Sequence, residues 1–212
     1  MTNKGLFITF EGADGCGKTT QIELLNKYLS EKNYKTIVTL EPGGSDIGKN
    51  LRQILLHHDG FVSKKAELFM YLADRAQHVE AVIQKNVTEG KIVLCDRHVD
   101  STVAYQGYAR CGNIEQIELL NNIATSNYKP DITFVLDVDS LVAQTRVGDE
   151  KDRLEAEGLE FHKKVRFGYL ELAKKHPDRI KVIDANQTIE EVFSQIKKII
   201  DNILWTKKLK AY

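Results

Sequence analysis

The 212-residue sequence has little cysteine, no excess of charge of either sign and no long apolar run. Its three cysteines, Cys16, Cys95 and Cys111, lack the spacing of metal ligands, and their odd number fits a reducing compartment better than a disulfide framework. Thirty lysines and arginines balance thirty aspartates and glutamates, so the net charge predicts no general attraction to nucleic acid or to an anionic membrane. No apolar run approaches the roughly 20 residues of a membrane-spanning helix, and no signal peptide precedes the first expected strand. We therefore expect a cytoplasmic protein with no membrane or nucleic-acid partner.

Proline is also scarce, with three residues, and the sequence has no Pro-rich linker, internal repeat or low-complexity tract that would separate two domains. The hydrophobic content of 42% is ordinary for a chain with a buried core. We therefore expect residues 1–212 to form a single domain.

Five short apolar segments predict buried β-strands, and each is followed by sequence with helical periodicity. The strands are expected at residues 6–10, 35–40, 91–96, 131–137 and 179–184. Strands that alternate with helices, among them 19–30, 47–58 and 66–88, predict an α/β fold with a five-stranded parallel sheet and helices on both faces. Ligands of such sheets bind beyond the carboxyl ends of the strands. Polar residues follow those ends here, namely Asp14, Glu41, Asp96, Arg97 and residues 184–187.

The segment between the first strand and the first helix has the pattern of a phosphate-binding loop. It comprises Gly12, Ala13, Asp14, Gly15, Cys16, Gly17, Lys18 and Thr19, followed by Thr20. Glycines allow backbone N–H groups to turn toward an anion, the helix adds its positive N-terminal end, and the lysine reaches the terminal phosphates of ATP. The threonine hydroxyl suits Mg²⁺. The alternative is a tight strand-to-helix turn without a ligand, which does not require this combination of residues.

A phosphate-binding loop alone does not separate a kinase from a GTPase or an ATP-driven motor. A GTPase is expected to carry Asn-Lys-x-Asp after a late strand, and the segment at that place, Asp-Val-Asp-Ser at 137–140, does not match. A motor usually requires a longer chain. Arginines are abundant near the expected strand ends instead, and guanidinium groups bind phosphate through paired hydrogen bonds, which favours a second phosphorylated substrate. These arginines are Arg52, Arg75, Arg97, Arg146 and Arg153, any one of which is alternatively a solvated surface charge.

Two further segments have patterns that bear on a binding site. Tyr71 and Arg75 are four residues apart and share one face of the expected helix, where a ring stacks on a base and a guanidinium reaches its edge. Residues 147–158 are highly charged and have little to bury, which predicts a mobile lid.

Together these segments resemble a thymidylate kinase of the bacterial type. The resemblance rests on the phosphate-binding loop, Glu-Pro-Gly-Gly at 41–44, Ala-Asp-Arg at 73–75, Asp-Arg at 96–97, Ser-Thr at 101–102, Ala-Tyr-Gln-Gly at 104–107, and Asp-Arg-Leu-Glu at 152–155 before Tyr-Leu-Glu-Leu-Ala at 169–173. It spans nearly the whole chain. It implies a P-loop NTPase fold with a mobile lid, and the transfer of the γ-phosphoryl group of MgATP to thymidine monophosphate (dTMP), which gives dTDP and ADP in the synthesis of dTTP.

The resemblance also implies a role for each residue of a dTMP site. Asp14 accepts a hydrogen bond from the sugar 3′-hydroxyl, Arg97 binds the monophosphate, and Arg75 donates to the thymine O4. Arg52, Glu41 and Pro42 border the phosphate, and Thr102 and Gln106 lie at the other polar edge of the base. Tyr71 stands where the family usually has a stacking phenylalanine. Tyr105 is placed to crowd a ribose 2′-hydroxyl, which favours a deoxynucleotide.

For ATP, the resemblance implies that Lys18 and arginines of the lid act on the transferring group, with Arg146 and Arg153 as the candidates. Asn186 and Gln187 match the loop that holds the adenine, although a loop and helix cap without a ligand has the same residue types. Mg²⁺ is expected on Thr19 and near Asp96. Asp96 is alternatively the ion-pair partner of a nearby arginine.

Two other functions remain open at this point. One is a kinase for another nucleoside monophosphate, such as uridylate, and the other is an ATP-binding regulator without catalysis. The resemblance also implies a homodimer. The helices expected at 66–88 and 114–123 carry apolar residues on more than one face. Either a second copy of the chain or the protein's own core would bury these residues. The six histidines lack ligand spacing, and we assign them no catalytic role.

Overall fold

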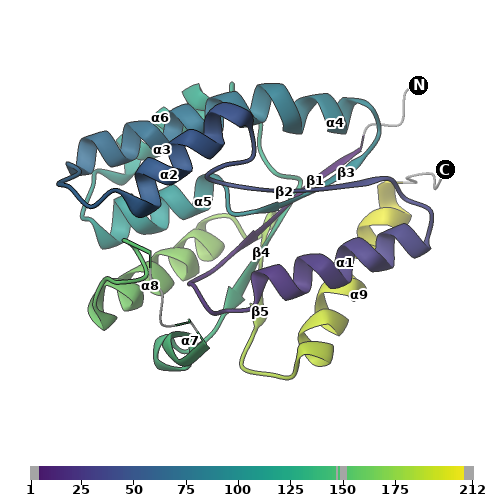
Figure 1. Cartoon of the computed structure of the whole chain (residues 1–212). Coiled ribbons are helices and arrows are strands. Elements are labelled where there is room, and N and C mark those ends of the chain that lie inside the picture. The colour runs from purple at the N-terminus through teal and green to yellow at the C-terminus, as the bar shows by residue number, and fades with distance from the viewer. Residues whose placement is uncertain (1–4, 147, 149–151, 208–212) are drawn as a thin grey trace.

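The computed structural model of the chain describes residues 5–146, 148 and 152–207. A five-stranded sheet with the order β2-β3-β1-β4-β5 runs through its centre, and every neighbouring pair of strands is parallel (Figure 1). Each strand lies within one residue of the segment that the apolar pattern predicts, so the five-stranded parallel sheet is confirmed. The strands are β1 (Leu6–Glu11), β2 (Thr36–Leu40), β3 (Ile92–Asp96), β4 (Ile132–Asp137) and β5 (Ile180–Asp184).

Helices connect the strands and cover both faces of the sheet (Figure 1). They are α1 (Lys18–Glu31), α2 (Asp46–His57), α3 (Lys64–His78), α4 (Lys85–Thr88), α5 (Val99–Thr102), α6 (Ile114–Ala124), α7 (Ser140–Arg146), α8 (Leu159–Lys175) and α9 (Ile189–Lys207). In the described residues, none of these helices is long and apolar enough to cross a membrane.

Two π-helical segments interrupt the α-helical hydrogen-bond pattern. η1 (Val79–Gln84) joins α3 to α4, so the helix expected at 66–88 is continuous but has a wider turn in its middle. η2 (Val103–Ala109) continues α5 and contains Tyr105 and Gln106. The apolar pattern does not reveal these segments, because each spans only six or seven residues, too few to distinguish a wider turn from the period of an α-helix. Such segments are frequent at functional sites, since they redirect individual side chains.

Side-chain alternation along β1 divides the core into two layers. Leu6, Ile8 and Phe10 are fully buried against the side that α1 and α9 cover, and Phe7 is fully buried on the opposite side, against η1 and α4. A third cluster lies between η2 and α8 and includes Tyr105. Burying a side chain of this size contributes about 1.5–3 kcal/mol, so this central strand is held firmly. The rigid strand presents the phosphate-binding loop directly at its carboxyl end.

The predicted lid, residues 147–158, is only partly within the described residues. Positions 147 and 149–151 lie outside them. Residues 153–156 form turns beside α2, where the Arg153 N–H donates to the Leu56 carbonyl at 3.2 Å and the Leu154 side chain is buried. This part of the segment therefore buries an apolar side chain, which the charged pattern does not suggest.

Candidate active site

A cavity of about 740 Å³ opens at the carboxyl ends of the strands. It runs from the phosphate-binding loop to the walls formed by α3 and η2, and on its other side to the start of α9. Most residues predicted from the sequence line it. They are Asp14, Gly15, Cys16, Gly17, Lys18, Thr19, Thr20, Glu41, Pro42, Arg52, Tyr71, Arg75, Asp96, Arg97, Thr102, Tyr105, Gln106, Arg146 and Gln187. Gly12, Ala13, Arg153 and Asn186 are the predicted site residues that do not line it.

The phosphate-binding loop has the backbone that its glycines allow. Gly12, Gly15 and Gly17 have φ values of 140°, 78° and 94°, a region that other residues rarely adopt. At Gly12 a side chain would also collide, because its Cβ would lie 2.7 Å from the Leu136 carbonyl oxygen. The Lys18 Nζ lies over the loop and donates to the carbonyl oxygens of Gly12 and Ala13 at 3.3 and 3.1 Å. The loop thus forms a ring of backbone groups around a lysine, at the N-terminus of α1.

Arg97 connects this loop to the opposite wall of the cavity. Its guanidinium forms an ion pair with Asp14 and donates to the Gly12 carbonyl oxygen at 2.9 Å, and it lies over the ring of Tyr105. The Tyr105 hydroxyl donates to the other oxygen of Asp14 at 3.0 Å. Burial alone would raise the pKa of Asp14, but Arg97 and Lys18 outweigh this effect and hold the pKa well below its usual range. Asp14 is therefore an ionised acceptor between two donors.

The backbone of Arg97 is in the left-handed region, with φ of 69°. This conformation costs a non-glycine residue about 1–3 kcal/mol and persists where the surroundings fix it, typically at functional sites. Here the Arg97 N–H donates to the Phe10 carbonyl of β1 at 2.9 Å, which holds the turn after β3 against the central strand. The strain aims the guanidinium into the cavity.

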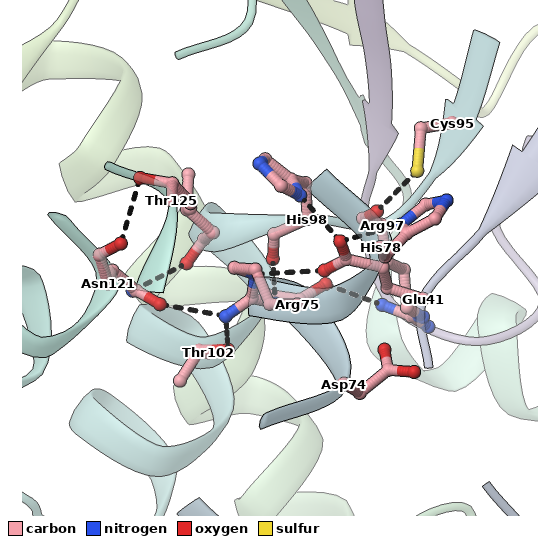
Figure 2. A network of polar contacts seen from close by, with 12 residues as sticks. Glu41, Asp74, Arg75, His78, Cys95, Arg97, His98, Thr102, Asn121 and Thr125 are labelled. Carbon is pink, nitrogen blue, oxygen red and sulfur yellow. Dashed lines mark hydrogen bonds and ion pairs between the residues drawn. The ribbon is translucent and has the colours of Figure 1, made fainter. Parts of the chain in front are cut away.

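Arg75 is fixed by a buried network that Figure 2 shows. Its Nε donates to Glu41 at 2.8 Å, its Nη1 to Thr102 and Asn121 at 2.7 Å each, and its Nη2 to the His98 carbonyl at 3.0 Å. Four of the five N–H groups of the guanidinium therefore have partners in the protein. The side chain is only 1% exposed, yet it lines the cavity. One N–H of Nη2 is left to reach a ligand.

Glu41 is the centre of this network. Besides Arg75, it pairs through Oε1 with the Nδ1 atoms of His78 and His98, at 2.9 Å each (Figure 2). Burial alone would raise the pKa of Glu41, but His98 and Arg75 hold it well below the usual range. Burial lowers the pKa of His98. The two histidines thus act as donors that orient a carboxylate, and no sequence spacing indicates this role.

A second buried carboxylate, Glu11, lies at the end of β1. It accepts from the backbone N–H of His98 at 2.8 Å, from Ser101 at 2.5 Å and from the Tyr169 hydroxyl at 3.0 Å. Burial and the nearby Asp100 raise the pKa of Glu11 to about 7. Because Ser101 and Tyr169 also accept from Arg97, Glu11 supports the arginine that faces the cavity.

The residues predicted to hold Mg²⁺ have suitable donors. Asp96 ends β3 and has a buried Oδ1 without a hydrogen-bond partner in the described residues, while Thr19 is exposed to the cavity. No group of three or more His, Cys, Asp or Glu side chains in the described part of the chain forms a complete metal cage. A carboxylate and a hydroxyl that leave most positions to phosphates and water are typical of a magnesium site.

The two lid arginines have different positions. Arg146, at the end of α7, lines the cavity and donates to the Ala185 carbonyl at 3.5 Å. Arg153 is turned away toward α3 and α2, where it pairs with Glu67 at 2.6 Å and donates to the Leu55 carbonyl at 3.0 Å. Of the two candidates, only Arg146 is in contact with the cavity in this structure.

The predicted adenine loop follows β5. Gln187 lines the cavity, whereas the Asn186 amide bonds back to Asp184 at 2.7 Å. Thr188 and Glu191 form reciprocal hydrogen bonds, since the Glu191 N–H donates to the Thr188 hydroxyl and the Thr188 N–H to the Glu191 carboxylate. This is a capping box at the start of α9, so part of the polar sequence here serves the helix.

Comparison with known proteins identifies this arrangement. The family model described as thymidylate kinase matches residues 10–196. The chain belongs to the thymidylate kinase family. Curated thymidylate kinases from Clostridium novyi and Maridesulfovibrio salexigens are 44% and 48% identical to it, over 92% and 93% of this chain and 98% and 96% of theirs. The crystal structure of thymidylate kinase from Ehrlichia chaffeensis superposes with a TM-score of 0.78 at 35% identity, covering 93% of this chain and 99% of that one.

Family membership confirms the resemblance and the P-loop NTPase fold. The hydrogen bonds of the site add supporting residues that the motifs leave out, namely Glu11, His78, His98, Asn121 and Tyr169. Asn121 and Tyr169 contact Arg75 and Arg97 directly, and the other three act through Glu41 or through Ser101 and Tyr169. Glu11 directly precedes the phosphate-binding loop, and its charge in an otherwise apolar strand was a usable signal. The others come from distant parts of the chain and carry no local signal.

Proposed function

We propose that this protein transfers the γ-phosphoryl group of MgATP to dTMP, giving dTDP and ADP. The observation that carries the proposal is the continuity of one cavity, which joins the phosphate-binding loop to a wall containing Arg97, Arg75 and Tyr71. In this proposal a nucleoside triphosphate binds at the end with the phosphate-binding loop and a nucleoside monophosphate at the end with Arg75 and Tyr71. Their phosphates meet between Lys18 and Arg97. The protein is therefore an ATP-dependent nucleoside monophosphate kinase in this proposal.

In the reaction, a phosphate oxygen of dTMP attacks the γ-phosphorus, the bond to the bridging oxygen breaks, and ADP leaves. The attacking oxygen is already anionic, so no general base is required. The protein contributes position and charge, as is usual for phosphoryl transfer. Lys18 and Arg97 face the transferring group from its two sides, and Arg146 is the lid arginine that contacts the cavity.

Mg²⁺ belongs to the same proposal. Thr19 and Asp96 would hold it, the first directly and the second with its buried, unpartnered oxygen. When bound, the ion neutralises charge on the phosphates. Asp96 has no hydrogen-bonded arginine partner in the described residues, which favours the metal role over the ion-pair role that the sequence left open.

The proposed dTMP site follows from the donors and acceptors around the cavity. The remaining N–H of Arg75 donates to the thymine O4, with Thr102 and Gln106 nearby. Tyr71 provides the ring that stacks on the base. Asp14 accepts from the sugar 3′-hydroxyl, and Tyr105, which is packed against Arg97, closes the space of a ribose 2′-hydroxyl.

A coupled assay of ADP production decides between this proposal and its rivals. We expect turnover with dTMP to exceed that with deoxyuridylate, uridylate, adenylate and guanylate. Faster turnover with uridylate would favour a uridylate-type kinase. Absence of turnover with every monophosphate, in protein that still binds ATP, would favour a regulator without catalysis.

The proposal also includes a cytoplasmic homodimer. The odd number of cysteines and their lack of pairing partners in sequence support a reducing compartment in this proposal. Phe69 on α3 and Leu119 and Ile123 on α6 are more than half exposed, and these two helices are in contact. A second copy that covers this face would bury all three. Analytical ultracentrifugation tests the dimer, and Ile123→Glu should shift it toward monomer.

A further inference from the structure

Glu67 is a buried carboxylate in the first turn of α3 that does not line the cavity. Its side chain is 2% exposed and has three partners. Oε2 pairs with Arg153 at 2.6 Å, while Oε1 lies 2.9 Å from the Gln106 Nε2 and 3.5 Å from the Arg110 Nε. Arg110 is itself held by Glu157 at 2.6 Å and lies over the Phe161 ring. Glu67 is therefore fixed by Arg153 of the predicted lid segment, by Gln106 of η2 and by Arg110 directly after η2.

This contact determines which end of the Gln106 amide faces the cavity. A carboxylate paired with two guanidinium groups offers only acceptors, so the amide must direct its NH₂ group toward Glu67. The other end, Oε1, accepts from no group in the described residues, and Gln106 lines the cavity. The amide therefore presents an acceptor to a ligand.

We propose that Glu67 is a positioning residue for base selection, which locks the Gln106 amide so that its Oε1 accepts the ring N3–H of thymine. This inference rests on the proposed function. The base edge then meets a donor from Arg75 at O4 and an acceptor from Gln106 at N3, which is the complement of thymine. Cytosine has the opposite pattern, an amino group and an unprotonated N3, so both contacts would be mismatched.

Glu67→Gln tests the lock with almost no change of shape. The variant has a single acceptor oxygen, for which Arg153 and Arg110 compete with Gln106. Because a charged donor forms the stronger hydrogen bond and Arg153 is the closer of the two arginines, at 2.6 Å against 3.5 Å for Arg110, Arg153 takes that oxygen. The new NH₂ group then occupies the place of Oε1 and faces Gln106. The Gln106 amide then reverses and presents its own NH₂ group to the cavity, against the thymine N3–H.

The measurement is kcat/KM for dTMP and for N3-methylthymidine monophosphate, in which a methyl group replaces the N3 hydrogen while O4 stays a carbonyl. The wild-type protein should prefer dTMP by about tenfold or more, the value of one hydrogen bond to a fixed acceptor. In Glu67→Gln the value for dTMP should fall by about tenfold, while that for the analogue stays within about threefold. Glu157→Gln is the matched control, since it removes another carboxylate from Arg110 without touching Gln106, and it should keep the wild-type ratio.

Gln106→Met provides an independent test without any change of charge. It should abolish the preference for dTMP over the analogue, and adding Glu67→Gln to it should leave the ratio unchanged. Equal loss for both substrates in Glu67→Gln would indicate a merely structural role and overturn the inference, as would a Gln106→Met variant that keeps the preference. Failure of the wild-type protein to phosphorylate dTMP would instead contradict the proposed function.

Discussion

The ion pair of Glu41 and Arg75 allows a direct test of how the cavity wall around Arg75, the proposed site of the base, is held in place. We expect Glu41→Gln to lower the free energy of unfolding by about 3–5 kcal/mol, because it leaves a buried guanidinium without its carboxylate. The two side chains are 2% and 1% exposed, so water cannot take over the lost contact. Glutamine also has one oxygen where Arg75, His78 and His98 all require an acceptor.

Urea-induced unfolding followed by circular dichroism measures this loss. For a chain of this length, 3–5 kcal/mol corresponds to a fall in the thermal midpoint of roughly 6–20 °C. Glu171→Gln is the control, because it makes the same chemical change in an exposed pair with Lys174 on α8 and should leave the midpoint unchanged. A loss for Glu41→Gln below about 1 kcal/mol would refute the view that this buried pair holds Arg75 in place.

Lys18→Ala should lower turnover by about 100-fold or more while dTMP binding, measured by calorimetry, stays largely intact, because the lysine serves the phosphates of ATP; equal loss of both would contradict its role. Glu11→Gln should change the pH dependence of stability. Burial and Asp100 raise the folded-state pKa of Glu11 from 4.5 to about 7, so the wild-type protein loses stability as pH rises through this range. The variant lacks this loss and should gain on the order of 3 kcal/mol relative to wild type between about pH 5 and pH 8, measured by urea unfolding, and a constant difference would contradict the assignment. Tyr71→Phe should change stability by less than about 1 kcal/mol, since the Tyr71 hydroxyl has no hydrogen bond in the described residues, and a larger loss in thermal unfolding would reveal a partner.

The strands and the phosphate-binding loop were predictable because their signals are local. A buried strand needs only a short apolar run, and the loop needs glycines and a lysine at fixed spacing before a helix. The prediction that residues 147–158 have little to bury was incomplete. The charged residues of this segment outnumber Leu154, whose side chain is buried beside α2. The sequence also leaves Arg146 and Arg153 equivalent. Their different positions depend on Glu67, which lies about 80 residues away in the chain and attracts only one of them.

The sequence by itself determined the fold class and, through family membership, the reaction, and it predicts the place of the phosphates. Only the tertiary structure decided how the site is held together. Arg97 meets Asp14, and Tyr169 meets Glu11, across separations of 83 and 158 residues. A parallel sheet brings the carboxyl ends of β1 and β3 to one edge, and α8 brings Tyr169 against the end of β1. Burial at that edge favours a partner for a charged group. No local pattern records which partner that is.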